Sequence, residues 1–392
     1  MKLLTITSLY PNHVENNLGI FIETRLNYLR EKYPDIAHTV IAPVPWFPFT
    51  HKKFGQYAKH AQVEKFEHCN GVDIYHPKYL VIPKIGMTVT PFFMAFSMGL
   101  LLRKLKKNNI SFDIVDGHYF YPDGVAIALV AKWFKYPFTI TARGTDLNLI
   151  PQYKVPRKLI QWAANKANHC ITVCAALKDV LLELGISDSK ISAMRNGVNL
   201  ERFSPSKNRT ELRQLLNIKD TTLISVGYLI ERKGHHLIIE ALKSLPDVNL
   251  VIIGSGPWFE KLSKLAEQHG VAERVKFTGS LPQDKVADYF RAGDIGMLAS
   301  SREGWANVLL ESMACGTPVV ATKVWGTPEV VASKDAGVLV ERTSESIAQG
   351  VKTLLEQKID RDKTRAYAEQ FNWDETSDAQ YQLFNDIIRT KS

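Results

Sequence analysis

The feature that most constrains the fold of this chain is a regular alternation of two kinds of segment. Short apolar runs of strand length, such as KLLTITSLY (2–10) and HTVIAPVP (38–45), flank a longer stretch with helical character, GIFIETRLNYLREKY (19–33). The second half repeats the pattern with TLISVGYL (222–229) and PVVATKV (318–324). Strands that alternate with helices predict parallel sheets covered by helices, the α/β class.

The chain of 392 residues is long enough for two domains, and a change of character suggests where they divide. The loop RNGVNLERFSP (195–205) carries Asn-Gly and Pro, and the strand-helix pattern restarts after it. We therefore predict two Rossmann-like domains, residues 1–200 and 201–370, that face each other across a cleft. A last segment, 371–392, has Trp373, Tyr381 and Phe384 at roughly helical spacing.

Composition favours a soluble protein of a reducing compartment. Hydrophobic residues make up 45% of the chain and charged residues 23%, and we find no uninterrupted apolar run long enough to span a bilayer. The start, MKLLTITSLYPN, is too short in its apolar part for a signal peptide. The four cysteines have neither metal-ligand spacing nor a disulfide pattern, so we expect a cytoplasmic location and no metal site.

The net charge of +9 is carried by one half of the chain. Residues 1–200 contain 24 Lys and Arg against 14 Asp and Glu, whereas residues 201–392 contain 25 against 26. A basic half could meet anionic lipid or a phosphorylated substrate. Without an arginine-rich stripe or a nucleic-acid motif, we expect no nucleic-acid partner.

A glycine motif that suggests a dinucleotide site is incomplete. GSGPWFEKL (254–262) begins like the fingerprint of nicotinamide-binding proteins but lacks the third glycine, and it lies in the middle of its domain. The first strand also leads into a loop without G-x-G-x-x-G. The sequence therefore gives little support to a dehydrogenase.

Two carboxylates in SREGWANVLLESMACG (301–316) carry the clearest chemical signal. Glu303 precedes a predicted helix that begins at Asn307 and ends at Gly316, and Glu311 lies on the same helix face as Asn307. At about 1.5 Å per residue, such a unit contacts groups about 10 Å apart, as in a nucleotide diphosphate-sugar. Carboxylates accept hydrogen bonds from diols, and a helix start favours phosphate. Taken alone, the pair could equally be a loop charge and a solvated helix charge.

These residues resemble a known family. EGWANVLLE (303–311) followed by SMACGTPVVAT is similar to the E-x7-E signature of the family 4 (group 1) retaining glycosyltransferases of the GT-B fold. VGYLIERKGHHLIIEAL (226–242) resembles the first strand and phosphate loop of their nucleotide domain, and IIGSGP, VKFTGSLP and GTPEVV match later segments. The resemblance covers nearly the whole chain. It implies an acceptor domain first, a nucleotide-sugar domain second, and a last helix that packs back on the first.

The resemblance implies a role for each residue of the motif. Glu303 would bind the hydroxyls of the donor sugar and Glu311 the ribose, while Lys233, with Arg232 beside it, would hold the diphosphate. Lys233 and Glu303 would then be catalytic, although a surface lysine before a turn is the plainer interpretation of Lys233 alone. The sugar and distal phosphate would be lined by Gly304, Trp305, Ala306, Asn307 and Val308.

One position departs from the family pattern. Relatives commonly carry an arginine directly after the glycine that ends this strand, and this chain has Tyr228. Arg232, Arg143 or Arg195 could supply the second positive charge at the phosphates, or the site could work with less. Trp305, where relatives often have another aromatic residue, could shape the sugar pocket or only pack.

The first half supplies further candidates. In LYPNHVENNLGIFIETR (9–25), Gly19 would let the backbone approach the donor phosphates. His118, just after a strand, lies where the family keeps a catalytic histidine near the reacting sugar, although a lone histidine is more often structural. Arg143, Asp146, Arg195 and Asn196 are candidates for phosphate or acceptor contacts, and Asp146 could equally be a cap or turn residue.

Two stretches combine apolar and basic residues. PWFPFTHKKFGQYAKH (45–60) mixes aromatics with lysines, and TPFFMAFSMGLLLRKLKK (90–107) is an apolar helix with a basic end. Both suit an interfacial contact with an anionic membrane or a lipid diphosphate. The plainer alternative is a core helix with a solvated end and a packed aromatic loop.

The resemblance implies a metal-independent, retaining transfer of a sugar from a UDP- or GDP-sugar to an acceptor hydroxyl, without a cofactor. The acceptor would be a glycan or lipid-linked glycan of cell-surface polysaccharide or lipopolysaccharide assembly, at the inner face of the cytoplasmic membrane. A sugar-nucleotide epimerase of the same fold is an alternative, although such epimerases do not as a rule carry the E-x7-E helix. A non-catalytic sugar-nucleotide-binding subunit is another, because Tyr228 leaves room for it.

Overall fold

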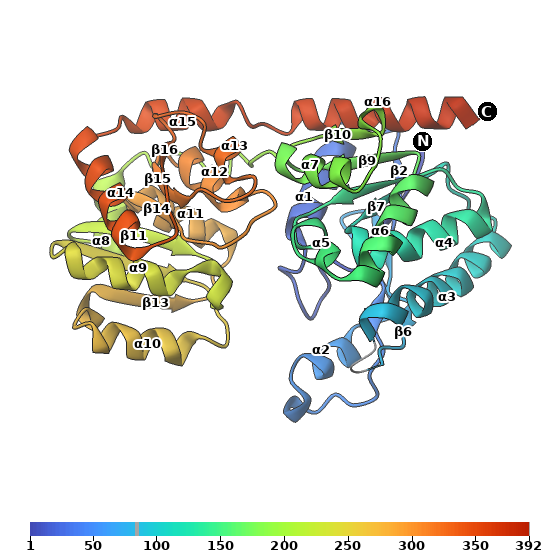
Figure 1. Ribbon diagram of the computed structural model, residues 1–392, viewed down its shortest axis with the longest axis horizontal. Coiled ribbons are helices and arrows are strands. Elements are labelled where there is room, and N and C mark those ends of the chain that lie inside the picture. The colour runs from blue at the N-terminus through green and yellow to red at the C-terminus, as the bar shows by residue number, and fades with distance from the viewer. Residues whose placement is uncertain (83–85, 392) are drawn as a thin grey trace. The chain divides into compact units, whose positions relative to one another are not determined.

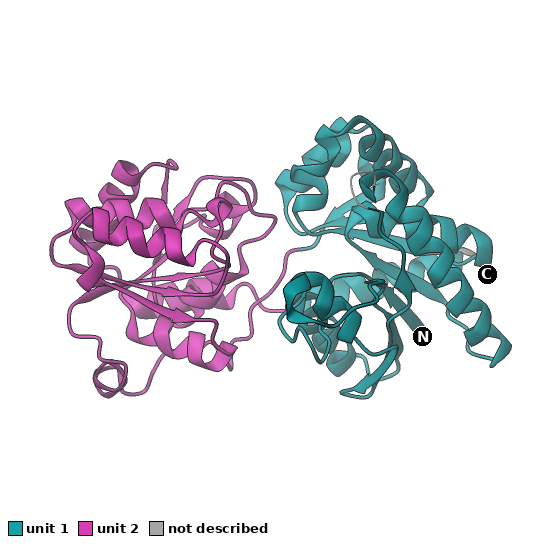
Figure 2. Cartoon of the chain, turned by 90° about the horizontal axis from the view of Figure 1, so that it is seen from below, with its two compact units in different colours: residues 1–194, 374–392 teal, residues 195–373 magenta. Residues whose placement is uncertain are grey.

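A computed structural model describes residues 1–82 and 86–391, and the chain forms two compact units (Figure 2). Unit 1 comprises residues 1–194 together with 374–392, and unit 2 comprises residues 195–373. The chain therefore leaves unit 1 after Met194 and returns to it at Asp374. The change in sequence pattern predicted the divisions at residues 200 and 370.

The described residues of unit 1 contain an eight-stranded sheet in the order β10-β9-β8-β7-β1-β2-β5-β4. Figure 1 labels several of these strands and the helices of the unit. Neighbouring strands run parallel from β10 to β5, as the alternation of strands and helices predicts. Its strands are β1 (Lys2–Ile6), β2 (Ala37–Ile41), β4 (Phe66–Cys69), β5 (Val72–Tyr75), β7 (Ile114–His118), β8 (Phe138–Ala142), β9 (His169–Thr172) and β10 (Ile191–Ala193). A separate parallel pair is formed by β3 (Val44–Pro45) and β6 (Lys78–Tyr79).

One edge of this sheet differs from the all-parallel expectation. Strand β4 pairs with β5 in antiparallel fashion, through a tight turn at Asn70 and Gly71. Both turn residues have positive φ, 50° and 72°, which is the geometry that Asn-Gly favours in two-residue hairpins. The signal was present in the sequence as HCNGVD (68–73).

Unit 1 also contains α-helices, one of which comes from the C-terminal end of the chain. They are α1 (Ile20–Lys32), α2 (Gln56–Gln62), α3 (Gly86–Lys107), α4 (Val125–Phe134), α5 (Thr145–Asn148), α6 (Lys154–Lys166), α7 (Ala175–Glu183) and α16 (Asp374–Lys391). The last of these packs against α1, although more than 340 residues separate them in sequence. Tyr33 and Tyr381 stack at 3.7 Å between ring centroids, and Phe384 is fully buried in the core with Leu26 and Leu29.

Unit 2 is built around a six-stranded parallel sheet in the described residues, in the order β13-β12-β11-β14-β15-β16. The strands are β11 (Thr221–Val226), β12 (Val248–Ile253), β13 (Val275–Gly279), β14 (Ile295–Leu298), β15 (Val319–Thr322) and β16 (Gly337–Val340). The helices are α8 (Arg209–Leu215), α9 (His235–Ala241), α10 (Phe259–Gln268), α11 (Gln283–Ala292), α12 (Asn307–Ala314), α13 (Thr327–Val330), α14 (Ser344–Gln357) and α15 (Arg361–Glu369). One large cluster of buried aliphatic side chains joins β11, β12 and β14 to α9, α10 and α14.

Helix α3 is the segment to compare with the expectation that no apolar run is long enough to span a bilayer. Its 22 residues are long and apolar enough to do so by length and composition alone, although 39% of the relevant window is buried inside the protein. The core helix of a soluble protein passes the same test. Thr90, Ser97 and Gly99 interrupt the apolar run, so the sequence contains no uninterrupted apolar stretch of spanning length here.

The position of Phe384 makes a prediction about stability. Replacing Phe384 by Ala should lower the free energy of unfolding of unit 1 by about 3–5 kcal/mol, the usual cost of emptying a fully buried phenylalanine site. Urea titration read by hydrogen exchange in β1 and β2 would isolate unit 1 from unit 2. Gln382→Ala, at an exposed position of the same helix, is the matched control. Equal stability of the two variants would mean that α16 folds separately from unit 1.

Candidate functional site

Two loops meet at the carboxyl edge of the unit 2 sheet. Strand β11 leads to a short helical turn at Glu231–Lys233, and the neighbouring parallel strand β14 leads to the loop that carries Glu303. Because the strands are adjacent and parallel, both loops leave the same edge, where α/β sheets bind ligands. Lys233 Nζ lies 2.6 Å from Glu303 Oε1, so the two predicted catalytic residues of this unit form an ion pair.

Gly234 allows the two loops to approach this closely. It has φ of 72°, in the left-handed region, and a Cβ at this position would lie 1.9 Å from the carbonyl oxygen of Ala299. The backbone N–H of Ser301 also donates to the carbonyl of Arg232 at 2.8 Å. A glycine after Lys233 is therefore required by both conformation and space, which is why E-R-K-G positions the lysine.

Only one oxygen of the Glu303 carboxylate is occupied. Oε1 accepts from Ser300 Oγ at 2.7 Å and from Lys233, and Arg232 Nη1 lies 3.5 Å away. Burial alone would raise the pKa of Glu303, but the charges of Lys233 and Arg232 outweigh it and hold the pKa below its usual value. Across the described parts of the chain, Oε2 has no hydrogen-bond partner. The ionised carboxylate therefore presents one fixed acceptor.

The Glu311 carboxylate differs from that of Glu303 in its partners. It lies on α12 and is partly buried, yet its carboxylate contacts no donor or cation within residues 1–82 and 86–391. Burial raises the pKa of Glu311 to about 7, and the distant charge of Arg202 offsets this only in part. A buried carboxylate without a partner is costly, so the position suits a group that receives donors from a ligand.

The start of α12 lies between the two glutamates in sequence. The backbone N–H groups of Gly304, Trp305 and Ala306 donate to no atom of the described chain, while those of Asn307 and Leu309 are used locally. Val308 lies in the first turn of the helix. Backbone N–H groups without a partner at a helix start favour an anion.

Trp305, Asn307 and Asn196 are fixed by neighbours within unit 2. The Trp305 ring is 6% exposed, packs against Phe371 at 6.1 Å, and has the Arg195 guanidinium 5.9 Å from its centroid. Asn196 Nδ2 donates to Asn307 Oδ1 at 3.2 Å. In the structure Trp305 is thus mainly a packing residue.

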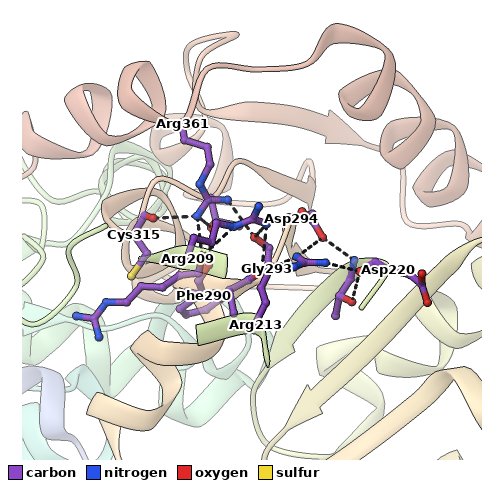
Figure 3. A network of polar contacts seen from close by, with 12 residues as sticks. Arg209, Arg213, Asp220, Phe290, Gly293, Asp294, Cys315 and Arg361 are labelled. Atoms are coloured by element: carbon purple, nitrogen blue, oxygen red, sulfur yellow. Dashed lines mark hydrogen bonds and ion pairs between the residues drawn. The ribbon is translucent and has the colours of Figure 1, made fainter. Parts of the chain in front are cut away.

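The C-terminal end of α12 is held by two arginines that sequence reasoning did not single out. Figure 3 shows one of them, Arg361, beside Cys315 and Gly293. Arg361 donates to the Cys315 carbonyl at 3.1 Å and to the Gly293 carbonyl at 3.0 Å, and Arg365 donates to the Ala314 carbonyl at 2.8 Å. Cations at a helix C-terminus satisfy the last carbonyls and complement the helix dipole. These contacts fix the helix that carries Glu311.

In unit 1, His118 is fully buried at the end of β7. Arg143 Nη2 lies 2.8 Å from His118 Nδ1, and Asp116 Oδ2 lies 3.0 Å from Nε2. Because a guanidinium can only donate, Nδ1 must accept and the proton lies on Nε2, facing Asp116. Burial lowers the pKa of His118 to about 4, against the attraction of Asp116. The side chain is therefore a neutral member of a buried network.

That network extends to the C-terminal helix. Gln380 of α16 donates to Asp116 Oδ2 at 3.2 Å and accepts from Arg25 Nε at 2.8 Å. Sequence reasoning missed Asp116, Arg25 and Gln380, because neither their spacing nor any motif connects them. The one sequence signal for this network is a charged residue, Asp116, within the strand segment IVDGH (114–118).

Asp146 and Gly19 have local structural roles. The Asp146 carboxylate accepts from the backbone N–H groups of Phe120, Arg143 and Gly144, which is the turn role left open by the sequence. Gly19 has φ of 63°, and a Cβ there would lie 2.2 Å from the carbonyl oxygen of Leu9. The close approach that Gly19 permits in unit 1 is to its own loop.

A cavity of about 200 Å³ opens at the carboxyl ends of β1, β2 and β5 in unit 1. Ser8, Asn12, Glu15, His60 and His76 are among its polar lining residues. The buried carboxyl of Asp123 accepts from the backbone N–H and the hydroxyl of the lining residue Ser8, and burial raises the pKa of Asp123 to about 7. This cavity lies where a parallel sheet binds its ligands.

The structure thus groups the candidates into two sets. Glu303, Lys233 and Arg232 meet in unit 2, with Ser300 as a partner that the sequence did not reveal. His118, Arg143 and Asp146 meet in unit 1. Of the arginines considered as substitutes at Tyr228, Arg232 lies at the ion pair and Arg195 pairs with Glu329 at 3.5 Å, while Tyr228 itself is 56% exposed.

Comparisons with family models and with curated proteins both point to glycosyltransferases. The model for group 1 glycosyl transferases matches residues 208–371, and that for glycosyltransferase family 4 matches residues 49–202. A putative teichuronic acid biosynthesis glycosyltransferase, TuaC, of Bacillus subtilis is 28% identical over 90% of this chain and 88% of its own. An N-acetyl-alpha-D-glucosaminyl L-malate synthase of Bacillus anthracis is 26% identical over 71% of this chain and 75% of its own.

Solved structures show the same architecture. Sucrose-phosphate synthase of Thermosynechococcus elongatus matches with a TM-score of 0.81 and 17% identity over the full length of both chains. HepE of Anabaena in complex with UDP-glucose matches with a TM-score of 0.73 and 19% identity, over 98% of this chain and all of its own. These likenesses confirm the GT-B fold. The chain belongs to the group 1, family 4 glycosyltransferases.

Proposed function

We propose that this glycosyltransferase moves a sugar, with retention of anomeric configuration, from a nucleotide diphosphate-sugar to an acceptor hydroxyl. The observation that carries the proposal is the arrangement around α12. A fixed acceptor at Glu303 Oε2, unpaired amides at Gly304–Ala306 and an unpartnered carboxylate at Glu311 follow one another along one segment. That order matches the order of sugar, phosphate and ribose in the donor.

Each group has a defined task in this proposal. Glu303 Oε2 accepts hydrogen bonds from hydroxyls of the donor sugar, and Glu311 accepts them from the ribose diol. The Lys233 ammonium has three donors, so it can hold the diphosphate without leaving Glu303, and Arg232 supplies the second charge that Tyr228 cannot.

The chemical step follows from these contacts. The acceptor oxygen bonds to the anomeric carbon on the face from which the diphosphate leaves, and the electron pair of the broken C–O bond departs on the phosphate. A phosphate oxygen takes the proton of the acceptor hydroxyl. Lys233, Arg232 and the amides stabilise the charge that develops, so the transfer needs no metal ion or cofactor. Neither glutamate acts as a nucleophile. The buried His118 acts as a positioning residue, because it holds the side chains of Asp116 and Arg143 in place.

The comparisons support a setting and a donor for this proposal. HepE was solved with UDP-glucose, and TuaC is named for teichuronic acid biosynthesis. We therefore favour a UDP-sugar donor and a glycan or lipid-linked acceptor of cell-surface polysaccharide assembly, bound at the unit 1 cavity. Four cysteines with free thiols fit the reducing cytoplasm.

The first test concerns Glu311. Replacing Glu311 by Ala should weaken UDP binding by about 1–3 kcal/mol, because the ribose loses hydrogen bonds to a charged acceptor. Isothermal titration calorimetry measures this directly. Glu356→Ala, at an exposed position on α14, is the control. Unchanged UDP affinity in Glu311→Ala would remove this residue from the ribose site.

The second test uses the protonation of Glu311. With a pKa of about 7, Glu311 is mostly neutral at pH 6 and mostly ionised at pH 8. Since the ribose donates to the ionised form, affinity should rise about tenfold from pH 6 to pH 8. UDP-glucose is the right probe, because its diphosphate ester lacks the phosphate group that titrates near pH 6. Glu311→Gln should show a flat profile, and a flat profile in the unmodified protein would contradict the role.

The third test concerns the leaving group. Lys233→Ala should lower the rate of UDP release from a UDP-sugar by about 100-fold or more, the usual cost of losing one stabiliser of developing charge. Lys233→Arg should keep part of the rate of the unmodified protein. The control Lys264→Ala, at an exposed position of unit 2, should keep all of it. Wild-type turnover in Lys233→Ala would show that this lysine does not stabilise the departing diphosphate.

A further inference from the structure

The outward face of α3 is more apolar than the fold requires. The opposite face of the helix is packed into unit 1 through Met94, Met98 and Leu102, which are buried. On the outward face, Phe92, Phe96 and Leu100 follow one another at a spacing of four residues and are 48%, 63% and 51% exposed. Side chains at this spacing form one continuous stripe, so three large apolar groups are presented to solvent together.

The same face becomes strongly cationic toward the end of the helix. Arg103, Lys104, Lys106 and Lys107 are all exposed, and α3 contains no Asp or Glu. Within the part of the chain that the structure describes, no acidic side chain forms an ion pair with any of these four. Their charge is therefore available to an external anion, and Leu100 lies with all four against one shallow surface hollow.

A tryptophan from the neighbouring helix extends the apolar stripe. Helices α3 and α4 lie side by side (Figure 1), and the exposed Trp133 of α4 is placed against Gly99. A Cβ at Gly99 would lie 3.2 Å from the Trp133 ring, so the glycine leaves the space that the indole occupies. Tryptophan is enriched where protein meets the headgroup region of a bilayer, because its ring is both apolar and a hydrogen-bond donor.

We propose that this α3 face, formed by Phe92, Phe96, Leu100, Trp133 and the four cations, docks unit 1 on an anionic bilayer surface. The apolar stripe enters the boundary between headgroups and acyl chains, and the cations pair with lipid phosphates. Charge complementarity selects this occupant, since four unpaired cations beside an apolar stripe match a surface that is anionic outside and apolar beneath. The helix lies along the membrane, because its other face is part of the unit 1 core.

Vesicle co-sedimentation of the full chain tests the proposal. The vesicles are phosphatidylcholine alone and phosphatidylcholine with 30% phosphatidylglycerol, at about 0.1 M salt. Phe96→Ser/Leu100→Ser removes apolar area, and Lys106→Gln/Lys107→Gln removes two charges. The matched controls lie on unit 2: Leu215→Ser at an exposed leucine, and Lys264→Gln/Lys352→Gln at exposed lysines.

We expect the unmodified protein to bind the anionic vesicles, with binding weakened at high salt. Lys106→Gln/Lys107→Gln should lose at least about tenfold in affinity, since each cation near an anionic surface contributes a factor of about five. Phe96→Ser/Leu100→Ser should lose a similar amount, while both controls bind as the unmodified protein does. UDP affinity should stay unchanged in every variant, which shows that they fold and separates this proposal from the donor site.

Three results would overturn the proposal. Equal binding to both vesicle types would remove the role of the cations, and equal loss in the unit 2 controls would remove the role of this face. Sedimentation velocity gives the third: a dimer in solution that Phe96→Ser/Leu100→Ser dissociates would identify a second copy of the chain as the occupant.

Discussion

The ion pair between Lys233 and Glu303 is the interaction on which the site of unit 2 depends. It joins the loops that follow two adjacent parallel strands, β11 and β14, and it neutralises a buried carboxylate while leaving one of its oxygens open. Gly234 makes the approach possible, and Ser300 and Arg232 complete the set of donors on the same oxygen. The arrangement is already ordered before a ligand binds, because the acceptor oxygen of Glu303 and the ammonium of Lys233 hold each other in place.

Helix α12 carries this arrangement from the loop to Glu311. Its N-terminus offers unpaired amides, and its C-terminus is held by Arg361 and Arg365 from α15. The helix is thus fixed at its C-terminal end, while the carboxylate in its middle has no partner among the described residues. Such a combination of a rigid support and an unsatisfied group is typical of a binding site, and it distinguishes Glu311 from a solvated surface charge.

The sequence predicted the parts of the fold that depend on local pattern. The alternation of strands and helices, the start of α12 at Asn307 and the helical spacing around Phe384 were all predictable, because periodicity and capping act over a few residues. The network of Arg25, Asp116 and Gln380 was not, because it joins residues more than 260 positions apart by side-chain contacts alone. His118 shows the same limit: its place after β7 was predictable, but its enclosure by Arg143 and Asp116 depends on tertiary packing.

The central claim is that one segment, 303–311, binds a nucleotide diphosphate-sugar along its length. A crystal structure of the protein with UDP tests it most directly. We expect both ribose hydroxyls to lie within hydrogen-bond distance of the Glu311 carboxylate, and the diphosphate to contact Lys233 and the amides of Gly304–Ala306. A ribose bound elsewhere, with Glu311 still unpartnered, would contradict it.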